Sequence, residues 1–100
     1  MTKVKHHLSL LPTWSTELAA DIAMSKSIEL SPEHIEILRI SRAFYDEYGF
    51  SPSMRPLCKS IAGVLGSEKG RSLYLNQLFP GSPAKQVALL AGLPKPKNCL

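Results

Sequence analysis

The chain of 100 residues contains no apolar run that approaches the roughly 20 residues needed to cross a bilayer. Its basic start is followed by an apolar segment, residues 8–11, that is too short for the core of a signal peptide. We therefore expect a cytoplasmic protein that does not engage a membrane. In that compartment its two cysteines, Cys58 and Cys99, are expected to be reduced and unbridged.

Strand-like alternation, internal repeats and low-complexity segments are equally absent from the sequence. Apolar residues recur instead at helical spacing, and 44% hydrophobic with 20% charged residues is typical of a soluble globular domain. One hundred residues suffice for one domain with a modest core. We therefore predict an all-α protein with about five short helices.

Capping residues, prolines and glycines indicate where these helices begin and end. The clearest start is Ser31, Pro32 and Glu33, which combine an N-cap serine, a first-turn proline and a first-turn acid. The helix that follows is expected to end at Gly49. The other helices are expected from Thr13 or Ser15 to about residue 26, from 51–53 to about 65, over 71–79 and over 85–91.

Four of the predicted helices have an apolar stripe that is expected to face the core. In chain order these stripes contain Trp14, Leu18 and Ile22; Ile37, Leu38, Ile40, Ala43, Phe44, Tyr45 and Tyr48; Leu57, Ile61, Val64 and Leu65; and Leu75 and Leu78.

The two ends of the chain differ from the helical body at 13–93. Residues 1–12 lack periodicity and are expected to form a loose tail. Residues 94–100, called the arm below, contain two prolines, which restrict the backbone and favour extended geometry. A flexible, extended arm would carry the thiol of Cys99 roughly 20 Å from the body, at ~3.3–3.6 Å per residue. A thiol in that position is suited to reacting with other proteins.

Several motifs, in order along residues 13–100, resemble the DsrC/TusE family of sulfur-relay proteins. They are Leu30-Ser31-Pro32-Glu33-His34, Phe44-Tyr45, Ser51-Pro52, Glu68-Lys69-Gly70, Leu78-Phe79-Pro80, Pro83-Ala84-Lys85-Gln86 and Ala91-Gly92-Leu93-Pro94-Lys95-Pro96, followed by Cys99. The resemblance implies a small orthogonal helical bundle. The family's usual N-terminal β-hairpin is expected to be absent or reduced, because only about twelve residues precede the first helix.

One position separates the two branches of this family. The DsrC branch carries a second arm cysteine eleven residues before the penultimate one, where this chain has Ala88. The resemblance therefore implies the single-cysteine TusE branch, whose members are sulfurtransferases that carry sulfur as a persulfide. By that resemblance Cys99 is the catalytic residue, an upstream sulfur-relay complex is the donor, and a tRNA thiouridylase with bound tRNA is the acceptor, giving 2-thiouridine. Neither a metal nor an organic cofactor is implied.

Persulfide relay requires a thiolate, yet an ordinary thiol titrates near ~8.5 and is only a few per cent ionised at neutral pH. Lys95 and Lys97 favour the thiolate of Cys99, whereas the terminal carboxylate of Leu100 opposes it. Between exposed charges these effects are screened and are expected to cancel roughly. We therefore expect the thiol of Cys99 to be activated by the active site of its partner.

Four basic residues are candidates for partner docking: Lys95, Lys97, Lys85 and Arg71. The first two flank the reactive end of the arm, whereas Lys85 and Arg71, with Gln86, follow from the resemblance alone. Each can also be interpreted as a solvated surface charge. The net charge of +4 and the pI of about 9.3 are compatible with an acidic or RNA-bearing partner and do not require one.

Two other functions are kept as alternatives. The chain could be a DsrC-like partner or regulator in dissimilatory sulfur metabolism. It could also be a DNA-binding protein with a helix-turn-helix over 35–65, whose second helix carries Arg55 and Lys59, so direct nucleic-acid binding is left open.

The remaining cysteine and the histidines are assigned structural roles. Cys58 has apolar neighbours and is expected to be an inert core thiol, with a transient disulfide to Cys99 as the alternative. His6, His7 and His34 lack the ligand spacing of a zinc site. His34, in the first turn of a helix, is expected at the surface.

Overall fold

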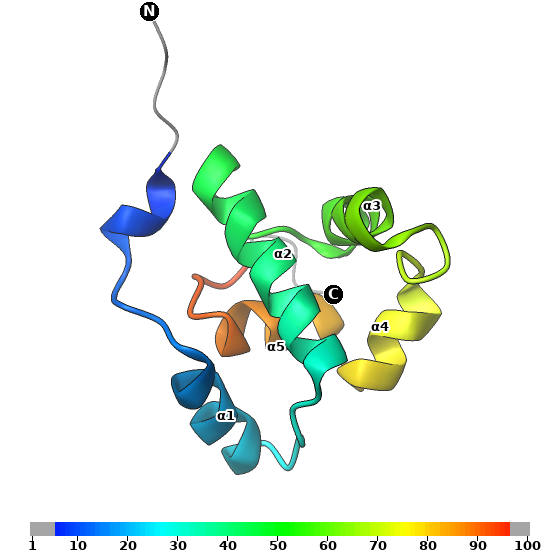
Figure 1. Cartoon of the computed structure of the whole chain (residues 1–100), viewed down its shortest axis with the longest axis horizontal. Coiled ribbons are helices and arrows are strands. Elements are labelled where there is room, and N and C mark those ends of the chain that lie inside the picture. The colour runs from blue at the N-terminus through cyan, green and yellow to red at the C-terminus, as the bar shows by residue number, and fades with distance from the viewer. Residues whose placement is uncertain (1–5, 97–100) are drawn as a thin grey trace, which may run out of the picture.

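The computed structural model describes residues 6–96, which contain six helical elements and no strand. They are the 3₁₀ turn η1 (His7–Leu10) and the helices α1 (Thr16–Ser25), α2 (Pro32–Tyr48), α3 (Met54–Leu65), α4 (Ser72–Leu78) and α5 (Pro83–Leu90). In Figure 1, α2 runs through the middle of the bundle and α5 crosses it, with α1 and η1 on one side and α3 and α4 on the other. The predicted fold class, a small orthogonal bundle of five helices, is confirmed.

Local capping explains where the first two helices begin. The side chain of Ser15 accepts a hydrogen bond from the backbone N–H of Leu18 at the start of α1. At the start of α2, Ser31 and His34 form a reciprocal capping box with Pro32 between them. Helix α2 ends where Gly49 adopts φ 81°, a left-handed conformation that glycine tolerates. The predicted boundaries of α2 therefore agree with the structure.

The core is formed by one cluster of apolar side chains drawn from all five α-helices and the segments between them. Its fully or nearly fully buried members are Ala19, Ala23, Ile37, Leu38, Tyr45, Leu57, Ile61, Leu75, Phe79, Val87, Ala88, Leu90, Ala91 and Leu93. Among the predicted core positions, this confirms Ile37, Leu38, Tyr45, Leu57, Ile61 and Leu75.

The predicted inner face of α1 was partly wrong. Leu18 is 43% exposed, whereas Ala19 and Ala23 are fully buried. Helix α1 packs against α5, and small side chains at the contact allow two helices to approach closely. Ile22 and Trp14 pack at the edge of the core. The buried face of α1 is therefore centred on its small residues, Ala19 and Ala23, and not on Leu18.

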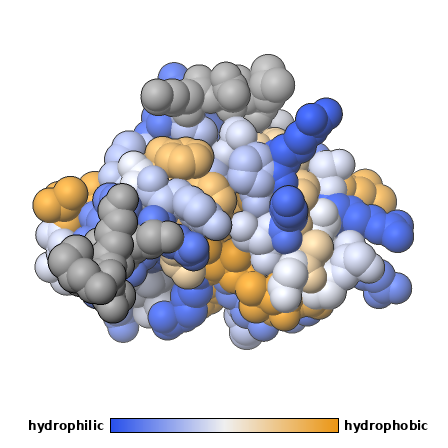
Figure 2. Space-filling view, turned by 90° about the horizontal axis from the view of Figure 1, so that it is seen from above, coloured by the Kyte–Doolittle hydropathy of each residue, from blue (hydrophilic) through white to orange (hydrophobic). Residues whose placement is uncertain are grey.

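The predicted faces of α2 and α3 were too wide. Tyr48 is 53% exposed, Val64 is 67% exposed, and Ala43 is also at the surface. Helix α2 contacts η1, α3 and α5, and its buried residues include Leu38 and Tyr45. The space-filling view in Figure 2 shows hydrophobic and hydrophilic residues interspersed on one face, as expected when apolar stripes extend beyond the core.

His34 was expected at the surface, but only 8% of it is exposed. Its Nδ1 accepts hydrogen bonds from the backbone N–H and the hydroxyl of Ser31, at 3.1 and 2.7 Å. Its Nε2 donates to the carbonyl oxygen of Leu78 at 2.8 Å, and its ring meets Phe79 edge-on. Both ring nitrogens are therefore satisfied by the fold, which permits burial.

The N-terminal residues that the structure describes do not form the loose tail that we expected. The Nδ1 of His7 donates to the backbone oxygen of Asp46 at 2.8 Å, and the N–H of Leu8 donates to its carboxylate at 3.0 Å. These bonds attach η1 to the last turns of α2. The prediction was wrong here because Asp46 lies almost forty residues away in the sequence; residues 1–5 lie outside the described part of the chain.

Candidate functional site at the base of the arm

The predicted reactive residue, Cys99, and the neighbouring Lys97 lie outside the described residues. The described part of the arm is Pro94, Lys95 and Pro96. The geometry of the candidate site is therefore that of the base of the arm, where the chain leaves α5.

The end of α5 is closed by a turn that fixes the direction of the chain. Gly92 has φ 70°, and its N–H donates to the carbonyl oxygen of Leu89 at 3.3 Å. The N–H of Leu93 donates to the carbonyl oxygen of Ala88 at 2.8 Å, which completes a Schellman motif. The side chain of Leu93 is buried in the core. The turn is thus attached to the body immediately before the arm begins.

Two side chains from distant elements bind the last carbonyl groups of α5. The indole Nε1 of Trp14 donates to Leu90 at 2.8 Å, and Nη1 of Arg42 donates to Ala91 at 2.6 Å. The guanidinium of Arg42 also lies 4.7 Å from the centre of the Trp14 ring, in cation–π contact. These donors satisfy carbonyl groups that a helix end leaves without intrahelical partners.

The charge of Arg42 suits its position at the carboxyl end of α5, where the helix dipole is negative. Burial lowers the pKa of Arg42, and the nearby carboxylate of Asp46 opposes this effect. Because an arginine starts from so high a pKa, the group remains charged at neutral pH. The hydrogen bond to Ala91 is therefore charge-assisted, which strengthens it.

A further contact holds the arm beyond this turn. The hydroxyl of the buried Ser51 donates to the carbonyl oxygen of Pro94. Pro96 is also buried, whereas Pro94 and Lys95 are exposed. The expectation that the arm projects from Leu93 is therefore wrong for its first three residues, which lie along the body.

A shallow pocket of about 310 Å³ adjoins this part of the arm. It is lined by Tyr45, Gly49, Phe50, Ser51, Ser53, Pro94 and Lys95. Phe50 belongs to a cluster of three aromatic rings at the surface. Its ring centre lies 5.4 Å from that of Phe44 and 6.3 Å from that of Tyr48. The arm base thus borders an apolar surface on the segment that links α2 to α3.

The candidate docking residues that the structure describes come from three separate elements. Lys95 is exposed beside the pocket at the arm base. Lys85 is exposed in the first turn of α5, and Arg71 is exposed at the N-cap of α4. Their exposure suits both docking and simple solvation, so docking by these side chains stays a prediction.

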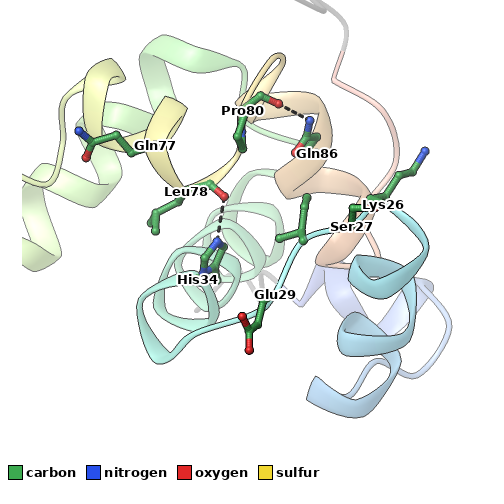
Figure 3. A pocket seen from close by; sticks show the side chains of 9 residues that line it. Lys26, Ser27, Glu29, His34, Gln77, Leu78, Pro80 and Gln86 are labelled. Carbon is green, nitrogen blue, oxygen red and sulfur yellow. Dashed lines mark hydrogen bonds between the residues drawn. The ribbon is translucent and has the colours of Figure 1, made fainter.

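Gln86 lies instead in a second pocket, of about 340 Å³, between the α1–α2 and α4–α5 connections (Figure 3). Its Nε2 donates to the carbonyl oxygen of Pro80 at 2.6 Å, while His34 donates to Leu78 on the other side. The first bond is local to the connection that precedes α5, the second joins α2 to α4, and Lys26 and Glu29 also line the pocket. The described side chain of Gln86 therefore has a structural role in holding the start of α5.

Cys58 lies on α3, half-buried against the core. Burial raises the pKa of its thiol, so less of it is ionised at neutral pH than of an ordinary cysteine. This environment agrees with the predicted inert thiol. A disulfide to Cys99 involves a residue outside the described part of the chain.

Within residues 6–96, no group of three His, Cys, Asp or Glu side chains is arranged to hold a metal ion. None of the helices in the same residues is both long and apolar enough to cross a membrane.

Sequence reasoning missed Arg42 and Ser51 and assigned Trp14 only to the core. A signal for Arg42 was present, because it lies four residues after Leu38 and three before Tyr45, on the flank of the buried face of α2. A charged residue at such a position requires a partner. The identity of that partner, a carbonyl group at the end of α5, could not be inferred from spacing.

A family model described as DsrC like protein matches residues 2–100. The chain belongs to the DsrC-like family. It is 48% identical over 99 residues to proteins named Sulfurtransferase TusE from Escherichia coli (strain K12) and Salmonella choleraesuis (strain SC-B67). Each alignment covers 99% of this chain and 91% of the relative. The predicted family and the predicted enzyme class, a sulfurtransferase, are thereby confirmed.

Solved structures of DsrC proteins share the fold of this family member. The NMR structure of DsrC from Allochromatium vinosum is 43% identical with a TM-score of 0.80, over 88% of this chain and 79% of that one. The crystal structure of the oxidized gamma-subunit of the dissimilatory sulfite reductase (DsrC) from Archaeoglobus fulgidus is 35% identical with a TM-score of 0.73, over 87% and 80%.

Proposed function

We propose that this DsrC-like protein is a sulfur carrier that accepts sulfane sulfur as a persulfide on Cys99 and passes it to a second protein. This proposal rests on the hydrogen bonds that hold the base of the arm against the body. Trp14, Arg42 and Ser51 bind three successive parts of the chain that leads toward the penultimate cysteine. The near full-length similarity to proteins named Sulfurtransferase TusE supports it independently.

The proposed transfer needs no external oxidant or reductant. The thiolate of Cys99 attacks the terminal sulfur of a donor persulfide, and a new sulfur–sulfur bond forms as the bond within the donor breaks. The donor leaves as a thiolate, and the transferred sulfur keeps its hydrogen or loses it to solvent. Repeating the step with Cys99 as donor delivers the sulfur and regenerates the thiol.

We propose an upstream sulfur-relay complex as donor and the tRNA wobble-uridine thiolation enzyme with bound tRNA as acceptor. The relatives named TusE support this choice over a role in dissimilatory sulfur metabolism. Ala88 also supports it, because position 88 offers no second thiol that could form a disulfide with Cys99. We propose that the relay takes place in the cytoplasm.

A DsrC-like role in dissimilatory sulfur metabolism is the second candidate, since the Archaeoglobus fulgidus neighbour is a sulfite reductase subunit by name. The helix-turn-helix alternative depends only on Arg55 and Lys59, which are exposed on α3. The helix-turn-helix alternative gives the attached arm base no chemical purpose.

Intact-protein mass spectrometry tests the proposal. The wild type, Cys99→Ser and Cys58→Ser are incubated with a cysteine desulfurase, cysteine and upstream relay proteins. We expect the wild type and Cys58→Ser to gain one sulfur atom that a reducing agent removes, and Cys99→Ser to gain none. Loading on Cys58, or no loading although the donors are active, contradicts the proposal.

The docking proposal is tested in the same assay. Exchanging Lys95 and Lys97 for glutamine is expected to raise the KM for the carrier and to leave the maximal rate of transfer nearly unchanged. Lys26→Gln, which removes one surface charge far from the arm in sequence, is the control. An unchanged KM in the double variant indicates that these lysines are only solvated.

A further inference from the structure

We infer that Arg42 is a positioning residue for sulfur transfer, acting through the base of the arm and not on sulfur itself. This inference rests on the proposed function of Cys99. A reactive group that misses its partner by about 1 Å can lose up to about 100-fold in rate. Only two residues separate the buried Pro96 from Cys99, so the Cα atom of Cys99 can lie at most about 11 Å from that of Pro96. Because this distance is short, the position of the Cys99 thiol depends strongly on where the arm leaves the body and in which direction.

Arg42 makes two contacts that no other side chain type reproduces together. Its Nη1 donates to Ala91 at 2.6 Å, and its Cζ lies over the Trp14 ring, 4.7 Å from the ring centre. A lysine would retain the charge but lose the planar guanidinium, which offers several N–H donors while its central carbon lies over the ring. Trp14 is in turn fixed by its own bond to Leu90. Arg42 and Trp14 therefore hold adjacent carbonyl groups in a single arrangement.

Gly92 lies between the two contacts that Arg42 and Ser51 make with the chain. Before Gly92 in the chain, the carbonyl oxygen of Ala91 accepts a hydrogen bond from Arg42. After it, the carbonyl oxygen of Pro94 accepts one from Ser51. Gly92 itself has the conformational freedom of glycine, with φ 70°. The hydrogen bonds of the Schellman motif and the buried Leu93 hold this turn, and the bonds from Arg42 and Ser51 fix the chain on either side of it.

The test compares Arg42→Met and Arg42→Lys with Arg39→Met, all in a Cys58→Ser background so that Cys99 is the only thiol. Arg39 lies one turn earlier on α2 and is exposed, so its exchange removes a charge from the same helix without touching the arm. Persulfide transfer from a loaded relay protein is measured over a range of carrier concentrations. Alkylation of Cys99 by iodoacetamide is measured in parallel.

We expect kcat for transfer to fall by between about 10- and 100-fold in Arg42→Met, with KM nearly unchanged. Arg42→Lys should lie between this variant and the wild type, and Arg39→Met should match the wild type. The rate of alkylation should stay within twofold in every variant, because a small reagent needs no fixed direction of approach. A purely structural defect does not produce this pattern.

Loss of folding is controlled with Ile61→Val, a conservative core change on α3 that leaves every arm contact in place. Amide exchange of Leu93 reports whether the turn after α5 has loosened, since its N–H is bound to Ala88. Wild-type kcat in Arg42→Met despite faster exchange at Leu93 overturns the inference. An equal fall in Ile61→Val, or a parallel fall in alkylation, also overturns it. If the wild type itself accepts no sulfur, the proposed function fails and the inference with it.

Discussion

The guanidinium of Arg42 donates a hydrogen bond of 2.6 Å to the carbonyl oxygen of Ala91, which lies 49 residues further along the chain. This contact joins the middle of α2 to the point where the arm begins. The indole of Trp14, which lies before α1, binds the preceding carbonyl group and carries the guanidinium on its face. The exit of the arm is thus held by a residue of α2 and by a residue of the segment before α1, both far from α5 in the sequence.

Exchange of Trp14 for phenylalanine tests the indole donor. The ring face remains available to Arg42, but the carbonyl group of Leu90 loses its partner. We expect a loss of about 1–2 kcal/mol in the free energy of unfolding, measured by urea denaturation. Tyr48→Phe removes a polar group from an exposed ring and should change stability by less than about 0.5 kcal/mol. Equal stability of Trp14→Phe and wild type would show that water replaces the indole.

Exchange of Gly92 for alanine tests the turn after α5. Gly92 has φ 70°, and an added Cβ would lie 3.0 Å from Cδ1 of Trp14. We expect a loss of about 1–2 kcal/mol in urea denaturation, because left-handed backbone disfavours a side chain. Gly63 is the matched control: it lies within α3 and an added Cβ there meets nothing within 4 Å. Gly63→Ala should therefore gain about 0.5–1 kcal/mol, and a loss at both positions would contradict the explanation.

The boundaries of the helices could be predicted from the sequence because local chemistry sets them. The Ser31–His34 capping box, Pro32 and Gly49 lie within or next to α2 and act over three or four residues. Family membership could be predicted for a similar reason, since its motifs are contiguous. Which face of a helix is buried depends on its neighbours, and the burial of Ala19 in place of Leu18 follows from the approach of α5.

The contacts that hold the arm base could not be predicted because they join residues far apart in the sequence. The bond from Trp14 spans 76 residues, that from Arg42 spans 49, and that from Ser51 spans 43. Neither periodicity nor capping rules report on such pairs. The same limit explains the error at His34, whose second partner, Leu78, belongs to α4.

His34 has two structural roles, since it caps the start of α2 through Ser31 and joins α2 to α4 through Leu78. Two substitutions at this position separate these roles. His34→Gln can keep the bond to the backbone N–H of Ser31, as glutamine does in ordinary capping boxes, but loses the bond to Leu78. We expect a loss of about 1–2 kcal/mol for His34→Gln and about 2–4 kcal/mol for His34→Ala, which loses both bonds. Urea denaturation of both variants gives the comparison. If the two losses are equal, the capping bond contributes nothing measurable to stability.

The thiol of Cys58 should react slowly and at higher pH than an ordinary cysteine. Burial raises its pKa in the folded protein, so the thiolate that attacks iodoacetamide is scarcer at any pH below that value. In Cys99→Ser, alkylation followed by mass spectrometry should show a rate below that of free cysteine at pH 8. Unfolding the same variant in urea should bring the rate up to that of free cysteine.

The same raised pKa of Cys58 makes a prediction about stability. The folded state binds the thiol proton more tightly than the unfolded state, so this contribution is fully present below the unfolded pKa of about 8.5 and is lost as pH rises through the higher folded pKa. Urea midpoints measured from pH 7 to pH 10 should therefore fall more steeply for Cys99→Ser than for the variant that also carries Cys58→Ser. Parallel slopes, or fast alkylation of folded Cys58, would place this thiol in solvent and reopen its part in sulfur or disulfide chemistry.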